Sequence, residues 1–165
     1  MTTPLTDQVK EELTAVVVPR QSARAAELAA MLRFAGELDI SGDNMAYELE
    51  LESHAIARRV IAALDELYGI SADSHVAGPA GTTKKSRVTV RISTGAKELT
   101  RRLGLITRSG HAVVGLPPQV ISGTVADSEA AWRGAFLAHG SLAEPGRSSA
   151  LEVTCPCHVR GCERS

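Results

Sequence analysis

A cluster of cysteine and histidine side chains lies at the C-terminal end of the 165-residue chain, in the pattern C-x-C-H-x3-C. Its members are Cys155, Cys157, His158 and Cys162. Thiolates and imidazole are preferred zinc ligands, but the first two cysteines are closer together than the usual C-x2-4-C spacing. Three cysteines in one tail, with none before them, also argue against a disulfide framework. We therefore expect no metal site and no cofactor.

A second set of side chains with possible chemistry is basic. Residues 83–110 contain eight Lys or Arg and one Glu, whereas residues 37–66 contain eight acidic and two basic residues. A local excess of positive charge can contact the phosphates of duplex DNA, although a charge run is more often an ordinary solvated face. The candidate DNA-contacting residues are Lys84, Lys85, Arg87, Arg91, Arg101 and Arg102.

The composition excludes several classes of protein. Only 3% of the residues are aromatic, so the chain lacks a platform on which single-stranded bases could stack. No run approaches the roughly 20 apolar residues of a membrane span, so we expect no membrane partner and a cytoplasmic, nucleoid-associated location. No Ser-His-Asp grouping or Gly-rich phosphate loop can be assembled, and we expect no enzyme activity.

The elements that must position these side chains follow from the hydrophobic pattern. We expect Thr6 to cap a first helix and Ser22 to cap a second that ends near Gly36. Apolar residues at helical spacing predict a third helix between a Ser53 cap and a Gly69 stop. A short helix over about 96–103 follows. Pro117 and Pro118 should then forbid regular structure, and Asp127 should cap the last helix.

Two strand pairs are expected between these helices, at about 37–51 and about 71–93. In the first pair Tyr47, Leu49 and Leu51 share one face. In the second pair Arg87, Thr89 and Arg91 point away from Val88, Val90 and Ile92, which predicts that one face of the sheet is basic. The order of elements indicates an α+β fold with antiparallel strands.

One small-residue helix pattern occurs twice, at Leu28–Gly36 and at Trp132–Gly140. Aligning Gly36 with Gly140, 104 residues later, also pairs Leu49 with Val153 without a gap. This indicates a duplicated unit whose two helices cross closely, although two unrelated Ala-rich helices would give a similar pattern. The small residues expected at the helix–helix seam are Ala30, Gly36, Gly134, Ala138 and Gly140.

The stretches G-L-P-P-Q-V-I-S-G (Gly115–Gly123) and A-W-R-G-A-F-L-A-H-G (Ala131–Gly140) resemble the WhiA sporulation and cell-division regulators of Gram-positive bacteria. The resemblance covers most of residues 6–156. It implies a degenerate LAGLIDADG homing-endonuclease fold followed by a helix-turn-helix, and a role in transcription control, cell division and chromosome partition. The chain departs from the family after Pro156, so we interpret residues 157–165 as a divergent tail from a shifted or prematurely ended reading frame. We therefore expect a truncated form without the helix-turn-helix.

In the endonucleases that this fold resembles, a carboxylate precedes the last Gly of each signature helix and holds the divalent metals that activate water. The matching positions here are Ala35 and His139, and neither supplies a carboxylate. The resemblance therefore implies a regulator without catalytic residues.

The fold class that follows is α+β, with LAGLIDADG-like duplicated units of a helix plus an antiparallel strand pair, the second unit incomplete. The expected parts are an N-terminal helix at 1–20, a first unit at 21–104, a Pro-containing linker at 105–126, the start of a second unit at 127–156 and the tail at 157–165. The expected partner is double-stranded DNA, bound weakly without the helix-turn-helix. Another transcription factor, bound without DNA contact, is the alternative.

Overall fold

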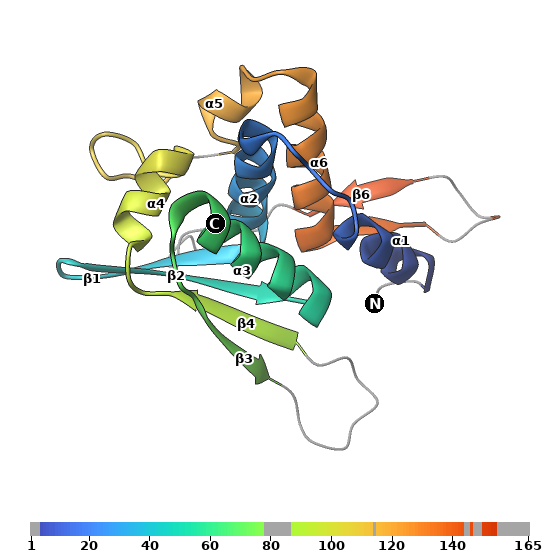
Figure 1. The fold of residues 1–165 in the computed structure, drawn as a ribbon, viewed down its shortest axis with the longest axis horizontal. Coiled ribbons are helices and arrows are strands. Elements are labelled where there is room, and N and C mark those ends of the chain that lie inside the picture. The colour runs from blue at the N-terminus through green and yellow to red at the C-terminus, as the bar shows by residue number, and fades with distance from the viewer. Residues whose placement is uncertain (1–3, 78–86, 114, 144–145, 147–149, 155–165) are drawn as a thin grey trace, which may run out of the picture.

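Two helices of equal length, α2 (Gln21–Ala35) and α6 (Val125–His139), lie side by side at the centre of the fold (Figure 1). The computed structural model describes residues 4–77, 87–113, 115–143, 146 and 150–154. Most small or apolar residues along the contact between the two helices are buried, including Ala29, Ala30 and Leu137 at 0% exposure. The helix pair is therefore the centre of the hydrophobic core and joins the two halves of the chain.

A four-stranded antiparallel sheet extends from the end of α2. Its strands are β1 (Gly36–Ser41), β2 (Asn44–Leu51), β3 (Asp73–Ala77) and β4 (Arg87–Ile92), in the order β1-β2-β4-β3. The expected alternation is confirmed, because Tyr47, Leu49 and Leu51 are buried, as are Val88, Val90 and Ile92. Their side chains all point to the face that the helices cover.

The helices α3 (His54–Tyr68) and α4 (Ala96–Leu103) cover that apolar face and leave the other face open (Figure 1). The Ser53 side chain accepts a hydrogen bond from the N–H of Ile56, and Gly69 ends α3 with a left-handed backbone (φ 64°), so both predicted caps of α3 are confirmed. Ile56, Val60 and Leu64 of α3 and Leu99 of α4 are fully buried.

The second half repeats the first. Helix α6 leads directly into β5 (Gly140–Leu142), which pairs with β6 (Leu151–Val153). Gly140 lies opposite Val153 just as Gly36 lies opposite Leu49, so the 104-residue offset holds for the helix bounds and for the strand register. The predicted α+β fold with duplicated units of a helix and an antiparallel strand pair is confirmed.

Three predicted N-caps are wrong, because all three residues lie inside their helices, where their side chains make tertiary contacts. Thr6 lies inside α1 (Pro4–Thr14), where its hydroxyl oxygen accepts from the N–H of Leu142 at 3.0 Å. Ser22 lies inside α2 and donates to Asp127 at 2.8 Å. Asp127 is the third residue of α6, and Thr124 is its N-cap in a capping box.

The expectation that both prolines exclude regular structure is also wrong. Pro118 begins a one-turn helix, α5 (Pro118–Ile121), where its missing N–H costs nothing. Within the described part of the chain, none of the helices combines the length and the apolar character needed to cross a membrane.

Candidate functional site

The seam between α2 and α6 is tightly packed at Gly134. A Cβ atom on Gly134 would lie 2.3 Å from the backbone oxygen of Glu27 and 3.2 Å from the Cβ of Ala30. Ala30 and Gly134 are equivalent positions of the two repeats, so the helices meet at their matching small residues. The missing side chain at Gly134 therefore allows the close approach.

The other small residues of the expected seam have different surroundings. Gly36 and Gly140 are the C-caps of α2 and α6, and a Cβ on either would clash with an aromatic ring of its own unit, Tyr47 or Phe136. Ala138 is buried at 2% exposure. Of the five residues, the structure thus places Ala30 and Gly134 directly against each other.

The positions that would carry the paired carboxylates of an endonuclease lie at the ends of the two helices. Ala35 is half-buried, and His139 precedes the Gly140 cap. Burial lowers the pKa of His139 below its usual range, Glu52 opposes that shift, and Lys10 adds to it. Lys10 is itself buried, with an ion pair to Glu52 at 2.8 Å. Glu52, a carboxylate at this end of the helix pair, is held by Lys10, and neither a lysine nor a histidine is a preferred ligand of a hard divalent cation.

No group of three or more His, Cys, Asp or Glu side chains that could hold a metal occurs among the described residues. The cluster formed by Cys155, Cys157, His158 and Cys162 lies outside those residues.

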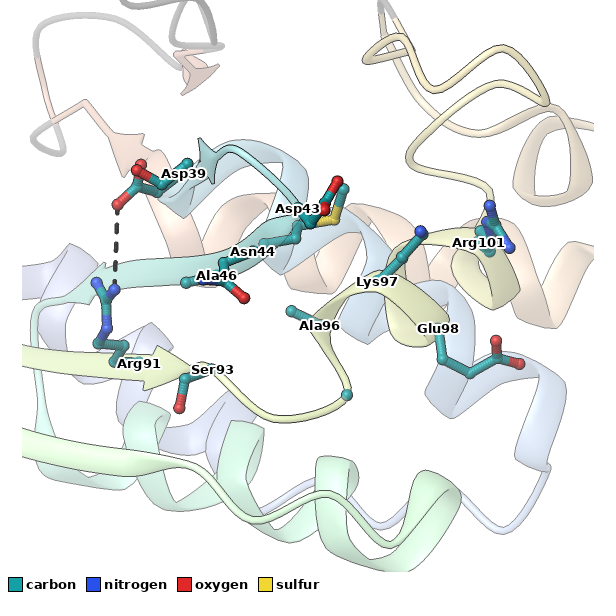
Figure 2. A pocket seen from close by; sticks show the side chains of 13 residues that line it. Asp39, Asp43, Asn44, Ala46, Arg91, Ser93, Ala96, Lys97, Glu98 and Arg101 are labelled. Carbon is teal, nitrogen blue, oxygen red and sulfur yellow. Dashed lines mark ion pairs between the residues drawn. The ribbon is translucent and has the colours of Figure 1, made fainter.

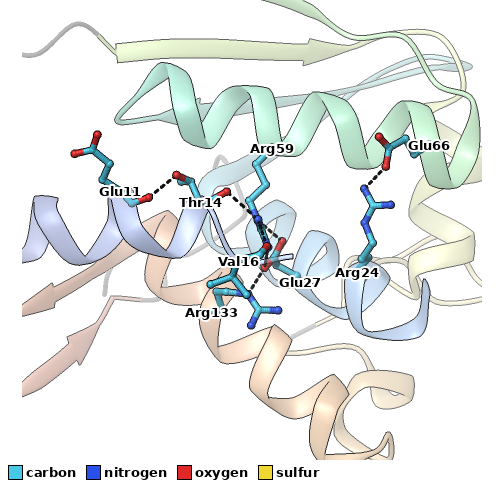
Figure 3. Close-up of polar contacts among 8 residues, drawn as sticks. All are labelled: Glu11, Thr14, Val16, Arg24, Glu27, Arg59, Glu66 and Arg133. Carbon is cyan, nitrogen blue, oxygen red and sulfur yellow. Dashed lines mark hydrogen bonds and ion pairs between the residues drawn. The ribbon is translucent and has the colours of Figure 1, made fainter. Parts of the chain in front are cut away.

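A buried ionic cluster crosses the seam, and sequence reasoning missed it. The Glu27 carboxylate, 6% exposed, accepts from Arg59 of α3 at 2.8 and 2.9 Å and from Arg133 of α6 (Figure 3). Arg59 also donates to the backbone oxygens of Thr14 and Val16. One acid therefore joins α2, α3, α6 and the segment that follows α1.

The open face of the sheet is not basic, so that expectation is wrong. Arg87 pairs with Glu50 at 2.7 Å, and Arg91 pairs with Glu48 at 3.0 Å. These acids come from β2, the neighbouring strand, whose outward positions are acidic where those of β4 are basic. The pattern of either strand alone did not show that the two would be adjacent.

The same face carries further acids from the outer strands. Asp39 of β1 lies 4.0 Å from Arg91, Glu37 lies opposite Glu48, and Asp73 of β3 lies opposite Arg91. Among the described residues, this face thus holds five carboxylates and two arginines. Phosphate groups would meet a surface with excess negative charge there.

A groove of about 540 Å³ lies between the β1–β2 hairpin and the start of α4 (Figure 2). Charged side chains of both signs line it: Asp39, Asp43, Arg91, Lys97, Glu98 and Arg101. Such a mixed lining favours neither an anion nor a cation.

Two of the remaining predicted DNA contacts lie on α4. Arg101 and Arg102 are exposed on the last turn of α4, and the Arg102 guanidinium stacks 4.7 Å from the centre of the Tyr68 ring. Neither arginine forms an ion pair within the described residues. Lys84 and Lys85 lie outside the described ranges.

Comparison with known proteins gives two matches to family models. Residues 21–106 match the WhiA N-terminal LAGLIDADG-like domain, and residues 128–159 match the WhiA LAGLIDADG-like domain. A probable cell division protein WhiA of Corynebacterium efficiens is 52% identical over 97% of this chain and 50% of its own length. Its counterpart in Corynebacterium diphtheriae is 54% identical over 93% of this chain and 47% of its own length. The chain spans about half the length of the curated relatives it matches.

Two solved structures have a similar fold. The N-terminal LAGLIDADG domain of DUF199/WhiA matches 94% of this chain and 70% of its own, with a TM-score of 0.64 at 20% identity. The full-length DUF199/WhiA from Thermatoga maritima matches 89% of this chain and 43% of its own, with a TM-score of 0.61 at 21% identity. Together with a family model that covers more than half of the chain, these similarities show that the chain belongs to the WhiA family, with a LAGLIDADG-like fold.

Proposed function

We propose that this chain is a non-catalytic LAGLIDADG-like part of a DNA-binding transcriptional regulator that acts in cell division, chromosome partition and sporulation. Membership of a family whose curated members are named cell division proteins supports the cellular role. The residues at the end of the helix pair support the proposed absence of catalytic activity. There Ala35 and His139 take the places where paired carboxylates would hold catalytic metals.

The proposed absence of catalysis predicts an outcome for a plasmid assay. Supercoiled plasmid incubated with the chain and either Mg²⁺ or Mn²⁺ should stay intact, because no pair of acids can position the metals. Nicking that is lost in a His139→Ala variant would contradict the proposal, since it would make His139 part of a nuclease site.

We propose that DNA contact by this chain is weak and independent of sequence, and is made mainly by Arg101 and Arg102 of α4 together with Lys84 and Lys85. Arg101 and Arg102 are exposed without carboxylate partners among the described residues, and Lys84 and Lys85 belong to the same basic stretch. Arg87 and Arg91 would have to break their ion pairs with Glu50 and Glu48 before they could contact phosphates. They are therefore secondary contacts.

A salt titration with two double variants tests this footprint. Arg101→Ala with Arg102→Ala should weaken binding equally for unrelated duplexes and reduce the slope of log K against log salt by about 2, one unit per lost phosphate contact. Arg87→Ala with Arg91→Ala, the matched control, should change the slope less. A larger effect of the control pair would place the footprint on the sheet, and unchanged binding in both would remove these four arginines from it.

A second candidate function is docking to another transcription factor without DNA contact. The ion-paired, acid-rich open face of the sheet favours it, because such a face repels phosphates and can accept a protein surface. Binding that is lost steeply with rising salt supports the DNA proposal. An absence of DNA binding even at low salt supports the docking alternative.

A further inference from the structure

A groove of about 550 Å³ lies between α3 and the non-helical segment that joins α1 to α2. Residues 14–18, at and after the end of α1, line it on one side. Arg58, Arg59 and several alanines of α3 line it on the other, together with Arg24 and Glu27 of α2, which Figure 3 shows beside Arg59. None of these residues is a candidate DNA contact.

The acids of the groove are already neutralised by arginines. The Glu27 carboxylate accepts from both Arg59 and Arg133, so this cluster keeps one positive charge in excess. Glu66 pairs with Arg24 at 2.6 Å, which balances that acid. In the groove beside α4, by contrast, acids and bases are equal in number. The groove beside α3 therefore attracts negative charge.

Arg58 is the arginine of this groove that has free donors. It is exposed on α3, and within the described ranges it forms no ion pair or hydrogen bond. The neighbouring Arg59 is engaged by the Glu27 carboxylate and by two backbone oxygens near the end of α1. A guanidinium matches both oxygens of a carboxylate. An anion in the groove is therefore bound by Arg58.

The opposite wall of the groove is suited to a peptide. Val16 and Val17 are 38% and 87% exposed, so this wall presents apolar side chains to solvent. The N–H and C=O groups of Val17 and Val18 form no hydrogen bond among the described residues. Extended peptides are bound through main-chain hydrogen bonds, and their alternate side chains give specificity. This wall offers both kinds of contact.

We propose that the groove binds an extended acidic peptide segment of a partner protein. The main chain of the segment lies along Val17 and Val18, its small apolar side chains contact the valines, and a carboxylate pairs with Arg58. The excess positive charge excludes a basic segment. The exposed valines and unpaired backbone groups fit a peptide better than the phosphates of DNA. Arg101 and Arg102 do not line this groove, so the proposal goes beyond the proposed DNA contact.

Two fluorescently labelled peptides test the proposal on the 165-residue chain. The first has the sequence Val-Asp-Val-Asp-Val and the second has the sequence Val-Asn-Val-Asn-Val, both with blocked ends. Fluorescence anisotropy measures their affinities at one fixed salt concentration. We expect the aspartate peptide to bind about tenfold more tightly than the asparagine peptide, because only a carboxylate forms a charged pair with Arg58.

Three variants locate the binding site. Arg58→Ala should weaken binding of the aspartate peptide about tenfold, because it removes the pairing guanidinium. Arg108→Ala is the matched control: it removes the same charge at another exposed arginine, outside the groove, and should leave the affinity unchanged. Val17→Asp places a carboxylate on the apolar wall and should also weaken binding about tenfold. All three positions are exposed, and circular dichroism should show the same helix content in every variant.

Four results would overturn the proposal. The first is no binding of the aspartate peptide, and the second is equal affinity for both peptides. The third is an equal loss in Arg58→Ala and Arg108→Ala, which would reduce the effect to net charge. The fourth is a loss of duplex DNA binding in Arg58→Ala as large as the loss of peptide binding, which would assign Arg58 to the DNA.

The proposal can fail separately from the proposed DNA contact. Arg101→Ala with Arg102→Ala should leave the affinity for the aspartate peptide unchanged, because neither arginine lines the groove. Loss of peptide binding in that double variant would place the peptide on α4 and contradict the groove.

Discussion

Glu27 holds two arginines that come from different helices, and its carboxylate is almost completely buried. Arg59 lies 32 residues away in the sequence and Arg133 lies 106 away. A lone acid in an Ala-rich helix gives no sign of such partners, so this part of the site could not be predicted from sequence. The two arginines satisfy both oxygens of the carboxylate, which makes its burial tolerable.

A Glu27→Gln variant should lose about 3 kcal/mol of folding free energy, because two half-buried arginines would remain without a counter-charge. Glu66→Gln is the matched control: its pair with Arg24 is exposed, so the loss should stay below about 1 kcal/mol. Urea unfolding curves of both variants measure the difference. Equal losses in the two variants would show that the Glu27 cluster adds no more than a surface ion pair.

At the scale of helices and strands, the sequence predicted the sheet well and the caps less well. The alternation in β2 and β4 gave the correct buried face, because it depends only on the two-residue period of a strand. Ser22 and Asp127 were assigned as caps from their residue types, yet they bond to each other across the helix pair. Short polar side chains serve caps and tertiary contacts equally well, and the local sequence does not distinguish the two uses.

The Asp127 carboxylate predicts a dependence of stability on pH. Hydrogen bonds from the Thr124 N–H and the Ser22 hydroxyl lower its pKa in the folded state below the ordinary value of 3.8. The charged form therefore stabilises the fold above pH 3.8, and that stabilisation is lost as the pH falls through the lowered pKa.

Asp127→Asn should accordingly be less stable than the unchanged chain near neutral pH, and the difference should shrink in acid. Thermal unfolding at several pH values measures it, with Glu129→Gln on the exposed side of the same helix as the control. A difference that stays constant down to pH 2 would assign the effect to packing rather than to charge.

At the scale of the whole molecule, the duplication was visible in the sequence because helix, turn and strand keep one spacing in both halves. The charge on the open sheet face was not, since it depends on which strands become neighbours. The sheet order β1-β2-β4-β3 places an acidic strand beside a basic one and pairs their side chains. The excess of Lys and Arg over residues 83–110 of the sequence therefore does not produce a positively charged sheet face.

The two halves should also differ in local stability, although they share one register. β2 is bonded on both edges, to β1 and to β4, whereas β6 pairs only with β5 among the described residues. In hydrogen exchange we expect the amides of β2 to be strongly protected and that of Glu152, in β6, to exchange much faster. Equal protection in both strands would show that β6 has a further partner in solution.

The missing methyl group at Gly134 also decides which helix can accompany α2. If a second α2 replaced α6, Ala30 would stand where Gly134 stands, and its Cβ would fall 2.3 Å from the Glu27 backbone oxygen. That distance is too short for a carbon and an oxygen that are not bonded, so two first units cannot assemble with each other at this spacing. Although the two repeats have the same topology, they are therefore not interchangeable. One additional carbon atom at this position prevents α2 from packing against a second α2 at the spacing at which it packs against α6.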